Sequence, residues 1–262
     1  MALNAEQLDR IAAHLHACEQ SHTDTHKVTD DFPEMTWDDA YAVQERIRAT
    51  RVAAGARVVG YKAGLTSHAK MKQMGVTDPV FGFLLDAHQV ESGAEIAVTG
   101  LIHPKVEPEI VFITREVLEG PGCHIGSVLA ACDVVVPGLE IIDSRYRDFK
   151  FDLKSVVADN TSAARFVLGR ERVDARALDL RTVGVVFEKN GEAVAFSAGA
   201  AVLGHPAAAV AMLVNHLGRR GQSLPAGSVV LSGGITEAVA VAPGDEVRVA
   251  IQDMGSASVK FV

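Results

Sequence analysis

The chain has 262 residues, of which 48% are hydrophobic and 22% are charged, and its formal net charge is −8 at pH 7. This length and composition predict a compact globular protein with a substantial core. The negative charge argues against a nucleic acid partner, because contact with phosphates needs a basic surface. An apolar run of about 18 residues, the length of a membrane span, does not occur, so we expect no membrane segment. The three cysteines lack metal-ligand spacing and indicate reduced thiols, as in a cytoplasmic protein.

The first part of the chain is predicted to be helical. Apolar residues recur there at helical spacing in two stretches, and each stretch follows a residue type that commonly caps a helix, Asn4 and Thr36. The remainder alternates short apolar runs with turn residues, as strands do. We therefore expect a small helical N-terminal domain over residues 1–75 and a β-rich domain over residues 76–262.

A short strand is predicted over Arg57–Thr66, where Gly60 and Gly64 permit close backbone approach. Lys62 lies in this strand between apolar and glycine positions, away from other charges. A half-buried lysine is a candidate base or anion anchor, because burial lowers its pKa. The alternative is an edge lysine whose ammonium group reaches solvent along its apolar stem.

Two glutamates share one face of a predicted strand over His103–Ile113. Because strand side chains alternate, Glu107 and Glu109 point the same way where the run becomes apolar. Carboxylates this close repel each other, and a hard divalent cation such as Mg²⁺ or Mn²⁺ would relieve the repulsion. A solvent-facing strand that carries two acids is the alternative. Pro108 removes one ladder donor, so we expect an edge strand or a bulge here.

Glu140 is the single charge in the apolar segment Val134–Ile142. A lone acid with core-type neighbours on both sides is hard to explain as a surface residue. With Glu107 and Glu109 it would give three carboxylates from two strands. Such a set suits one octahedral cation that keeps open positions for a substrate.

Other stretches leave alternatives open. The short polar side chains of Val157–Ser162 suit either turns and caps or hydrogen bonds to a ligand. The glycine-rich turn Ser232–Thr236 has amides that can hold an anion, although such turns are weak signals. Asn190-Gly191 predicts a hairpin, and Pro206 begins an alanine-rich helix.

Several ordered motifs together identify a family. They are Gly60–Thr66, Glu107 with Glu109, Leu139–Arg145, Val157–Asn160 and Gly204–Pro206. Over nearly its whole length, from about Leu8 to Val262, the chain resembles the hydratase/decarboxylase group of the fumarylacetoacetate hydrolase superfamily. The resemblance implies an α+β fold, with a small helical N-terminal portion and a mixed β-roll catalytic domain. It also implies bound Mg²⁺ or Mn²⁺ and a substrate with a 2-oxo or 2-hydroxydienoic acid head.

The resemblance also assigns roles to residues. It implies that Glu107, Glu109 and Glu140 bind the metal, that Lys62 is the charged group beside the substrate, and that Ser162 is its polar neighbour. It further implies substrate contacts from a larger set of residues: Leu65, Val80, Asp159, Gly233, Gly234, Ile235 and Thr236.

Within this group the chemistry is either decarboxylation of 4-oxalocrotonate (2-oxohex-3-enedioate) or hydration of 2-hydroxypenta-2,4-dienoate. Several stretches resemble the decarboxylating members: Lys27–Thr36, Ile142–Tyr146, Phe149–Leu153 and Gly233–Thr236. Similar hydratases carry an aspartate where this chain has Val80, which cannot deliver a proton or water. A hydrolase would need a base that is not evident here, and a catalytically silent partner would be expected to lack one of the acids or Lys62. The resemblance also implies possible association with the pathway hydratase.

Overall fold

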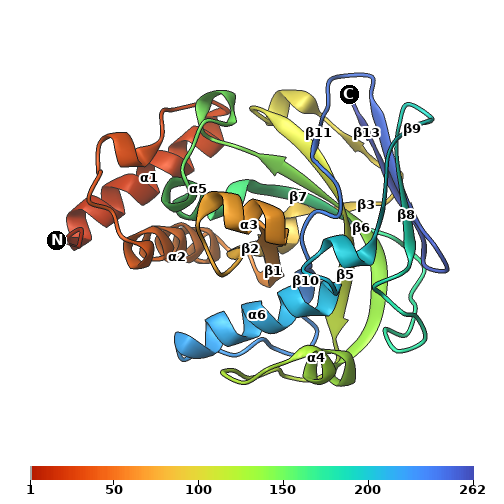
Figure 1. Ribbon diagram of the computed structural model, residues 1–262. Coiled ribbons are helices and arrows are strands. Elements are labelled where there is room, and N and C mark those ends of the chain that lie inside the picture. Colours follow the sequence, from red (N-terminus) through yellow and green to blue (C-terminus); the bar gives the residue numbers. More distant parts are fainter. Residues whose placement is uncertain (1) are drawn as a thin grey trace.

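Six α-helices and thirteen strands make up the computed structural model, which describes residues 2–262 (Figure 1). The helices are α1 (Ala5–Ser21), α2 (Trp37–Ala53), α3 (His68–Met74), α4 (Ile125–Ala131), α5 (Leu153–Ala158) and α6 (Pro206–Arg219). The first seven strands are β1 (Val58–Gly64), β2 (Val80–Leu85), β3 (Gln89–Glu91), β4 (Glu95–Ile96), β5 (Pro104–Thr114), β6 (Cys132–Asp143) and β7 (Ala163–Leu168). The last six are β8 (Gly184–Lys189), β9 (Glu192–Ala198), β10 (Val229–Leu231), β11 (Val239–Ala240), β12 (Glu246–Ile251) and β13 (Gly255–Phe261). Short 3₁₀ turns lie at Val28–Asp30, Asp86–His88, Val98–Gly100, Arg147–Phe149, Asn160–Ser162 and Gly199–Ala201.

Helices α1 and α2 form the helical N-terminal part, on the left in Figure 1. Both begin with a capping box, as their cap residues predicted. The Asn4 side chain accepts from the backbone of Gln7, and Thr36 is paired in the same way with Asp39. Their apolar faces pack together with α5 and with one face of β2. Local capping thus sets where the helices begin, and burial of one apolar face holds them against the sheet.

The remaining strands form two mixed sheets. The larger has eight strands, in the order β2-β1-β10-β5-β6-β7-β3, with β11 paired to β5. The smaller has the order β4-β13-β12-β8-β9, and β8 and β9 form the hairpin expected at Asn190-Gly191. The predicted α+β class with a mixed β-roll is confirmed. The boundary at residue 75 stays a prediction, and β1 from its N-terminal side is hydrogen-bonded inside the larger sheet.

The expectation that Pro108 marks an edge strand or a bulge is wrong. Strand β5 lies inside the larger sheet, paired with β6 on one side and with β10 and β11 on the other. Strand β10 pairs with residues 111–113 and β11 with residues 105–106, which leaves a gap beside Pro108. The Pro108 carbonyl faces this gap and accepts from the amide of Ile235 at 3.0 Å. The missing N–H therefore costs no ladder bond.

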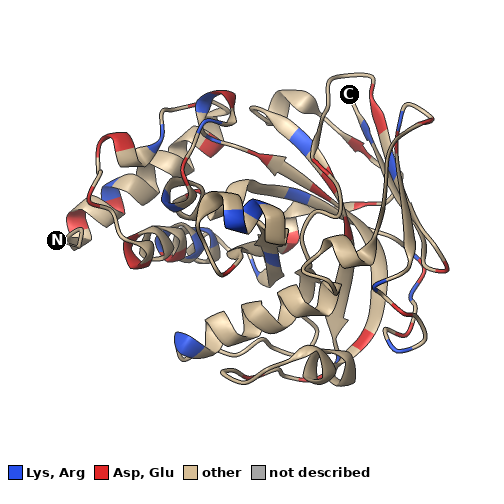
Figure 2. Ribbon diagram, viewed as in Figure 1, with Lys and Arg blue, Asp and Glu red and all other residues tan. Residues whose placement is uncertain are grey.

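Helix α6 packs in the core, next to α4 and β1. The segment Gly199–Arg219, which contains it, is long and apolar enough to cross a membrane by length and composition alone. Most of its large apolar side chains are buried in the protein, including Val210, Leu213 and Leu217. Core packing therefore accounts for its apolar character. In Figure 2 acidic and basic residues alternate over the ribbon, and acidic positions also lie within the central strands.

Candidate metal and substrate site

The three predicted glutamates meet on one face of the larger sheet. Strand alternation places Glu107 and Glu109 side by side on β5, and the register pairs Glu107 directly with Glu140 on β6. One carboxylate oxygen from each residue lies within 4.8 Å of those of the other two. The sheet register therefore brings together two motifs that are distant in sequence.

Burial and mutual repulsion make this cluster costly without a cation. Glu109 and Glu140 are fully buried, while Glu107 is partly exposed. Burial, followed by the charge of Glu140, raises the pKa of Glu107 to about 6. The same two causes raise the pKa of Glu109 well above its ordinary value. The alternative of a solvent-facing strand does not fit these buried acids.

The carboxylate oxygens suit a bound cation. Glu109 Oε1 and Glu140 Oε1 are buried without a hydrogen-bond donor among residues 2–262, and the Lys62 ammonium is the only cationic partner of Glu140 Oε2 there. Unpaired buried carboxylate oxygens are ligands that Mg²⁺ and Mn²⁺ prefer. The other oxygen of Glu109 accepts from the amide of Gly233 at 2.6 Å, which fixes its direction. The donor set therefore fits the metal that the family resemblance implies.

Lys62 lies beside the cluster and is almost completely buried, which excludes the alternative of an edge lysine. Its Nζ forms an ion pair with Glu140 Oε2 at 3.1 Å and donates to the carbonyl of Thr161 at 3.2 Å. Burial acts against its charge, but the acids around it, Glu140 first, raise the pKa of Lys62. The lowered pKa expected for a buried lysine is therefore wrong, because the neighbouring acids outweigh the effect of burial and favour the charged ammonium group.

Thr161 belongs to a turn of unusual backbone conformation. Asn160, Thr161 and Ser162 have φ angles of 47°, 51° and 59°, all in the left-handed region that non-glycine residues rarely adopt. All three are buried. The hydroxyl of Ser162 has no hydrogen-bond partner within the described part of the chain, so it is available to a ligand.

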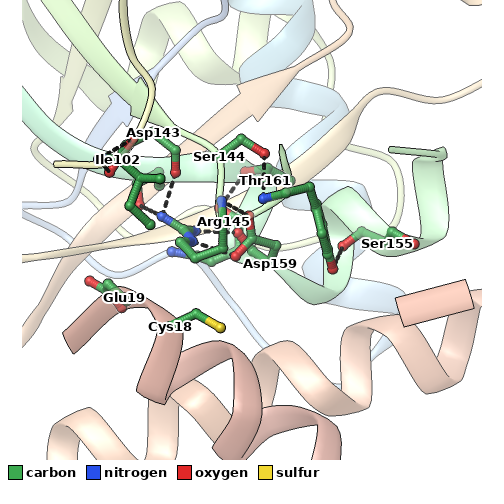
Figure 3. Close-up of polar contacts among 12 residues, drawn as sticks. Cys18, Glu19, Ile102, Asp143, Ser144, Arg145, Ser155, Asp159 and Thr161 are labelled. Atoms are coloured by element: carbon green, nitrogen blue, oxygen red, sulfur yellow. Dashed lines mark hydrogen bonds and ion pairs between the residues drawn. The ribbon is translucent and has the colours of Figure 1, made fainter. Parts of the chain in front are cut away.

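Asp159, which was predicted to bind substrate, has both carboxylate oxygens engaged by Arg145. Oδ1 accepts from the guanidinium and Oδ2 accepts from the backbone amide of Arg145 at 3.2 Å. Figure 3 shows Arg145 between Asp143 and Asp159, bound to both segments. Burial acts against the charge, but the Asp159 carboxylate raises the pKa of Arg145. The pair therefore anchors the turn and leaves Asp159 no free oxygen.

The glycine-rich turn after β10 covers the carboxylates. A Cβ at Gly234 would lie 2.9 Å from Glu107 Cδ, so the backbone approaches this acid more closely than other residues permit. Gly233 has a φ of 107° and donates to Glu109. Ile235 is buried in the core, and the hydroxyl of Thr236 donates to the carbonyl of Glu237. Gly233 and Gly234 therefore touch the predicted metal ligands, and the amide of Ile235 is bonded to Pro108 between them.

Val80 and Leu65 lie near the strand ends beside Lys62. A Cβ built on Gly64 would lie 3.3 Å from Val80 Cγ2 and 3.6 Å from Lys62 Nζ, so both groups converge on this glycine. Val80 is buried, and Leu65 is half-buried with a φ of 59°. An apolar side chain therefore stands next to the ammonium group of Lys62.

The model of the fumarylacetoacetate (FAA) hydrolase C-terminal family matches residues 57–262, which include every residue of this site. The chain belongs to the fumarylacetoacetate hydrolase family. This confirms the resemblance read from the motifs, and family membership agrees with the buried cluster of acidic ligands.

Two relatives of this fumarylacetoacetate hydrolase family member are informative. A 4-oxalocrotonate decarboxylase of Pseudomonas putida is 54% identical over 260 residues, which cover 99% of this chain and 98% of the relative. A 2-hydroxyhexa-2,4-dienoate hydratase of Comamonas testosteroni is 42% identical and covers 89% of both chains. A solved structure of the decarboxylase from Pseudomonas putida G7, with magnesium and adipate, is 53% identical, with a TM-score of 0.97 and 99% coverage of both chains.

Arg145, Asn160 and Thr161 also belong to this site and were not among the expected site residues, although Asn160 and Thr161 lie in the stretch Val157–Ser162 that was expected to form turns or to bind a ligand. Thr161 acts through its backbone carbonyl, which no side-chain pattern reports. Asn160 tolerates the left-handed conformation better than most residues, so its place in a dense polar stretch was a usable signal for a tight turn. The buried position of Arg145 follows from tertiary contacts alone.

Proposed function

We propose that this protein is a carboxy-lyase that decarboxylates 4-oxalocrotonate to 2-hydroxypenta-2,4-dienoate and CO₂, with Mg²⁺ or Mn²⁺ as cofactor. The observation that carries the proposal is the buried cluster of three carboxylates with Lys62 beside it, in an ion pair with Glu140. Full-length identity of 54% to a protein named for this reaction supports the choice of substrate.

The proposed reaction needs a site that accepts electrons at the far end of the substrate from the departing carboxylate. The C5–C6 bond breaks, its electron pair moves through C4 and C3 to the C2 oxygen, and CO₂ leaves. When bound by Glu107, Glu109 and Glu140, the metal supplies Lewis-acid chemistry for a 2-oxo acid. The Lys62 ammonium stabilises the negative charge that develops on the C2 oxygen, and it can donate the proton that completes the dienol.

The remaining residues hold and shape the substrate. The hydroxyl of Ser162 has no partner in residues 2–262 and offers a hydrogen bond to it. Val80 forms an apolar wall near Lys62 that favours the loss of charge when a carboxylate becomes CO₂. Gly233 fixes Glu109, and Gly234 leaves room at Glu107.

Hydration of 2-hydroxypenta-2,4-dienoate is the second candidate, since hydratases with 39–42% identity belong to the same set of relatives. Val80 argues against it, because no acid stands at this position to deliver a proton or water.

We also propose that the protein acts in the cytoplasm and passes its unstable dienol product to a pathway hydratase bound to it.

The deciding experiment follows CO₂ and 2-hydroxypenta-2,4-dienoate together after 4-oxalocrotonate is added, first with Mg²⁺ and then with EDTA. We expect CO₂ release that stops when the metal is removed. Loss of added 2-hydroxypenta-2,4-dienoate by water addition, without CO₂ release, would identify a hydratase instead.

A further inference from the structure

We infer that the left-handed turn Asn160–Ser162 is a positioning element for Lys62, held in place by Asn160 and Arg145. The inference rests on the proposed function, because it takes Lys62 as the residue that acts on the substrate. Apart from Glu140, the hydrogen-bond partner of Lys62 Nζ within residues 2–262 is the carbonyl of Thr161 at 3.2 Å. A backbone carbonyl is aimed by backbone conformation, so the shape of the turn decides where this acceptor lies.

Asn160 fixes the turn to the neighbouring strand. Its Oδ1 accepts from the amide of Phe83 at 2.9 Å, and its Nδ2 donates to the carbonyl of the same residue at 3.1 Å. The side chain thus pairs with both backbone groups of one residue of β2, as a further strand would. Strand β2 also pairs with β1, where Phe83 lies opposite Tyr61, next to Lys62. The turn is therefore bonded to β2, and β2 is paired with β1, the strand that carries Lys62.

Arg145 holds both ends of the turn. Its guanidinium donates to the carbonyl of Asp159 at 2.6 Å, just before the turn, and to the carbonyl of Ala163 at 3.4 Å, just after it. It also donates to the carbonyl of Asp143, at the end of the strand that carries Glu140. One buried side chain therefore ties the turn to the strand of a metal ligand.

Gly82 leaves the space that the turn occupies. A Cβ at this position would lie 2.8 Å from the carbonyl oxygen of Asn160 and closer still to the hydroxyl of Thr161. Real Cβ atoms essentially never come within 3.0 Å of such atoms, so Gly82→Ala must shift the turn and strand β2 relative to each other. This substitution changes no metal ligand and no residue of the turn. Gly82 also lies opposite Lys62 in the β1–β2 ladder, so a second variant that leaves this pair of residues unchanged is needed beside it.

The test compares Gly82→Ala with Gly184→Ala, a strand glycine remote from these contacts whose added Cβ would meet Gln252 Oε1 at 3.6 Å, an ordinary contact. Displacing a reacting group by about 1 Å costs about 100-fold in rate, so we expect kcat for CO₂ release to fall by about that factor in Gly82→Ala. KM and the Mn²⁺ dissociation constant should not change. Gly184→Ala should match the wild-type chain. Asn160→Ala removes both bonds to Phe83 and leaves the Gly82–Lys62 pair unchanged, so it should lower kcat as well.

A double-mutant cycle with Lys62→Met separates positioning from general damage. If the turn acts through Lys62, neither Asn160→Ala nor Gly82→Ala should lower kcat further in the Lys62→Met background, and Asn160→Ala decides because it lies outside the Gly82–Lys62 pair. Additive losses, or a lower melting temperature with an unchanged kcat of the folded protein, would overturn the inference. If the wild-type protein releases no CO₂, the proposed function itself is wrong. This outcome is distinguishable from failure of the inference, because it is seen without any variant.

Discussion

At the scale of single residues, the site depends on charges that the fold would not otherwise tolerate. Glu109 and Glu140 are buried, and each has an oxygen without a hydrogen-bond partner within residues 2–262. The positively charged side chain that forms an ion pair with the cluster there is Lys62. Removing one partner of a buried charge group usually destabilises a protein, because the remaining charge is left uncompensated. In this site three carboxylates share one lysine, so a bound divalent cation would compensate the remaining negative charge.

Glu140→Gln is expected to weaken Mn²⁺ binding by more than about 100-fold, because loss of even an outer-shell partner costs about 10–100-fold. The amide keeps the shape of the side chain and removes its charge. Isothermal titration with Mn²⁺ measures the effect, and Glu246→Gln, at an exposed position of β12, is the matched control. Equal affinities for both variants would show that Glu140 is not a ligand.

Metal affinity is expected to fall as the pH falls below about 6. The pKa of Glu107 in the metal-free protein is raised to about 6, and the metal binds the deprotonated carboxylate. Protons therefore compete below this pH, and one competing proton lowers the affinity about tenfold per pH unit. Titrations between pH 5 and pH 7.5 measure the slope, which should become shallower in Glu107→Gln. An affinity independent of pH would contradict the assignment.

Val80→Asp is expected to lower kcat for decarboxylation at least about tenfold, equivalent to about 1.4 kcal/mol. A carboxylate placed beside Lys62 would pair with the ammonium group and repel the anionic substrate. Val80→Asn introduces a side chain of nearly the same shape as aspartate but without its charge, and it serves as the control. Unchanged decarboxylation in Val80→Asp would remove Val80 from the mechanism.

At the scale of elements, register and backbone conformation place groups that residue types alone do not. The β5–β6 ladder sets Glu107 opposite Glu140, and a shift by one residue would turn Glu140 to the other face. The left-handed turn costs about 1–2 kcal/mol for each non-glycine residue, so it persists because Asn160 and Arg145 hold it.

The N-terminus of helix α2 is stabilised by a capping box of Thr36 and Asp39. Thr36 Oγ1 accepts from the amide of Asp39 at 3.1 Å, and the Asp39 carboxylate accepts from the amide of Thr36 at 2.9 Å. Thr36→Ala should lower the free energy of unfolding by about 1 kcal/mol, measured by urea denaturation. Thr50→Ala, on the exposed surface of α2, should not destabilise the protein. Equal effects of the two substitutions would show that the cap contributes nothing.

At the scale of the whole molecule, the metal site and the fold are energetically linked. The site contains residues of β1, β5 and β6, of the turn that follows α5 and of the turn that follows β10. A cation bound there would therefore connect the centre of the larger sheet to these two turns. A cation that binds the folded state alone stabilises it by mass action.

Saturating Mg²⁺ is therefore expected to raise the melting temperature. At a free concentration 100 times the dissociation constant, the gain is about 2.7 kcal/mol. For a chain of this size, that corresponds to about 5–11 °C. Differential scanning fluorimetry with Mg²⁺ and with EDTA measures the shift. The shift should be absent in Glu140→Gln, and an equal shift in that variant would show binding elsewhere.

Strong local signals in the chain were enough to predict several elements correctly. The capping residues Asn4 and Thr36 marked both N-terminal helices, and Asn190-Gly191 marked the hairpin. The alternation of strand side chains put Glu107 and Glu109 on one face, and the apolar surroundings of Glu140 marked it as unusual. These predictions succeeded because each depends on residues close together in the chain.

The tertiary structure alone decided the rest. It placed β5 inside the sheet despite Pro108, because the neighbouring strands leave a gap there. It raised the pKa of Lys62 through acids from two other strands, where burial alone would lower it. It also engaged Asp159 with Arg145 and aimed the Thr161 carbonyl at Lys62. The contact between Lys62 and Thr161 joins residues 99 positions apart, and local sequence carries no record of such contacts.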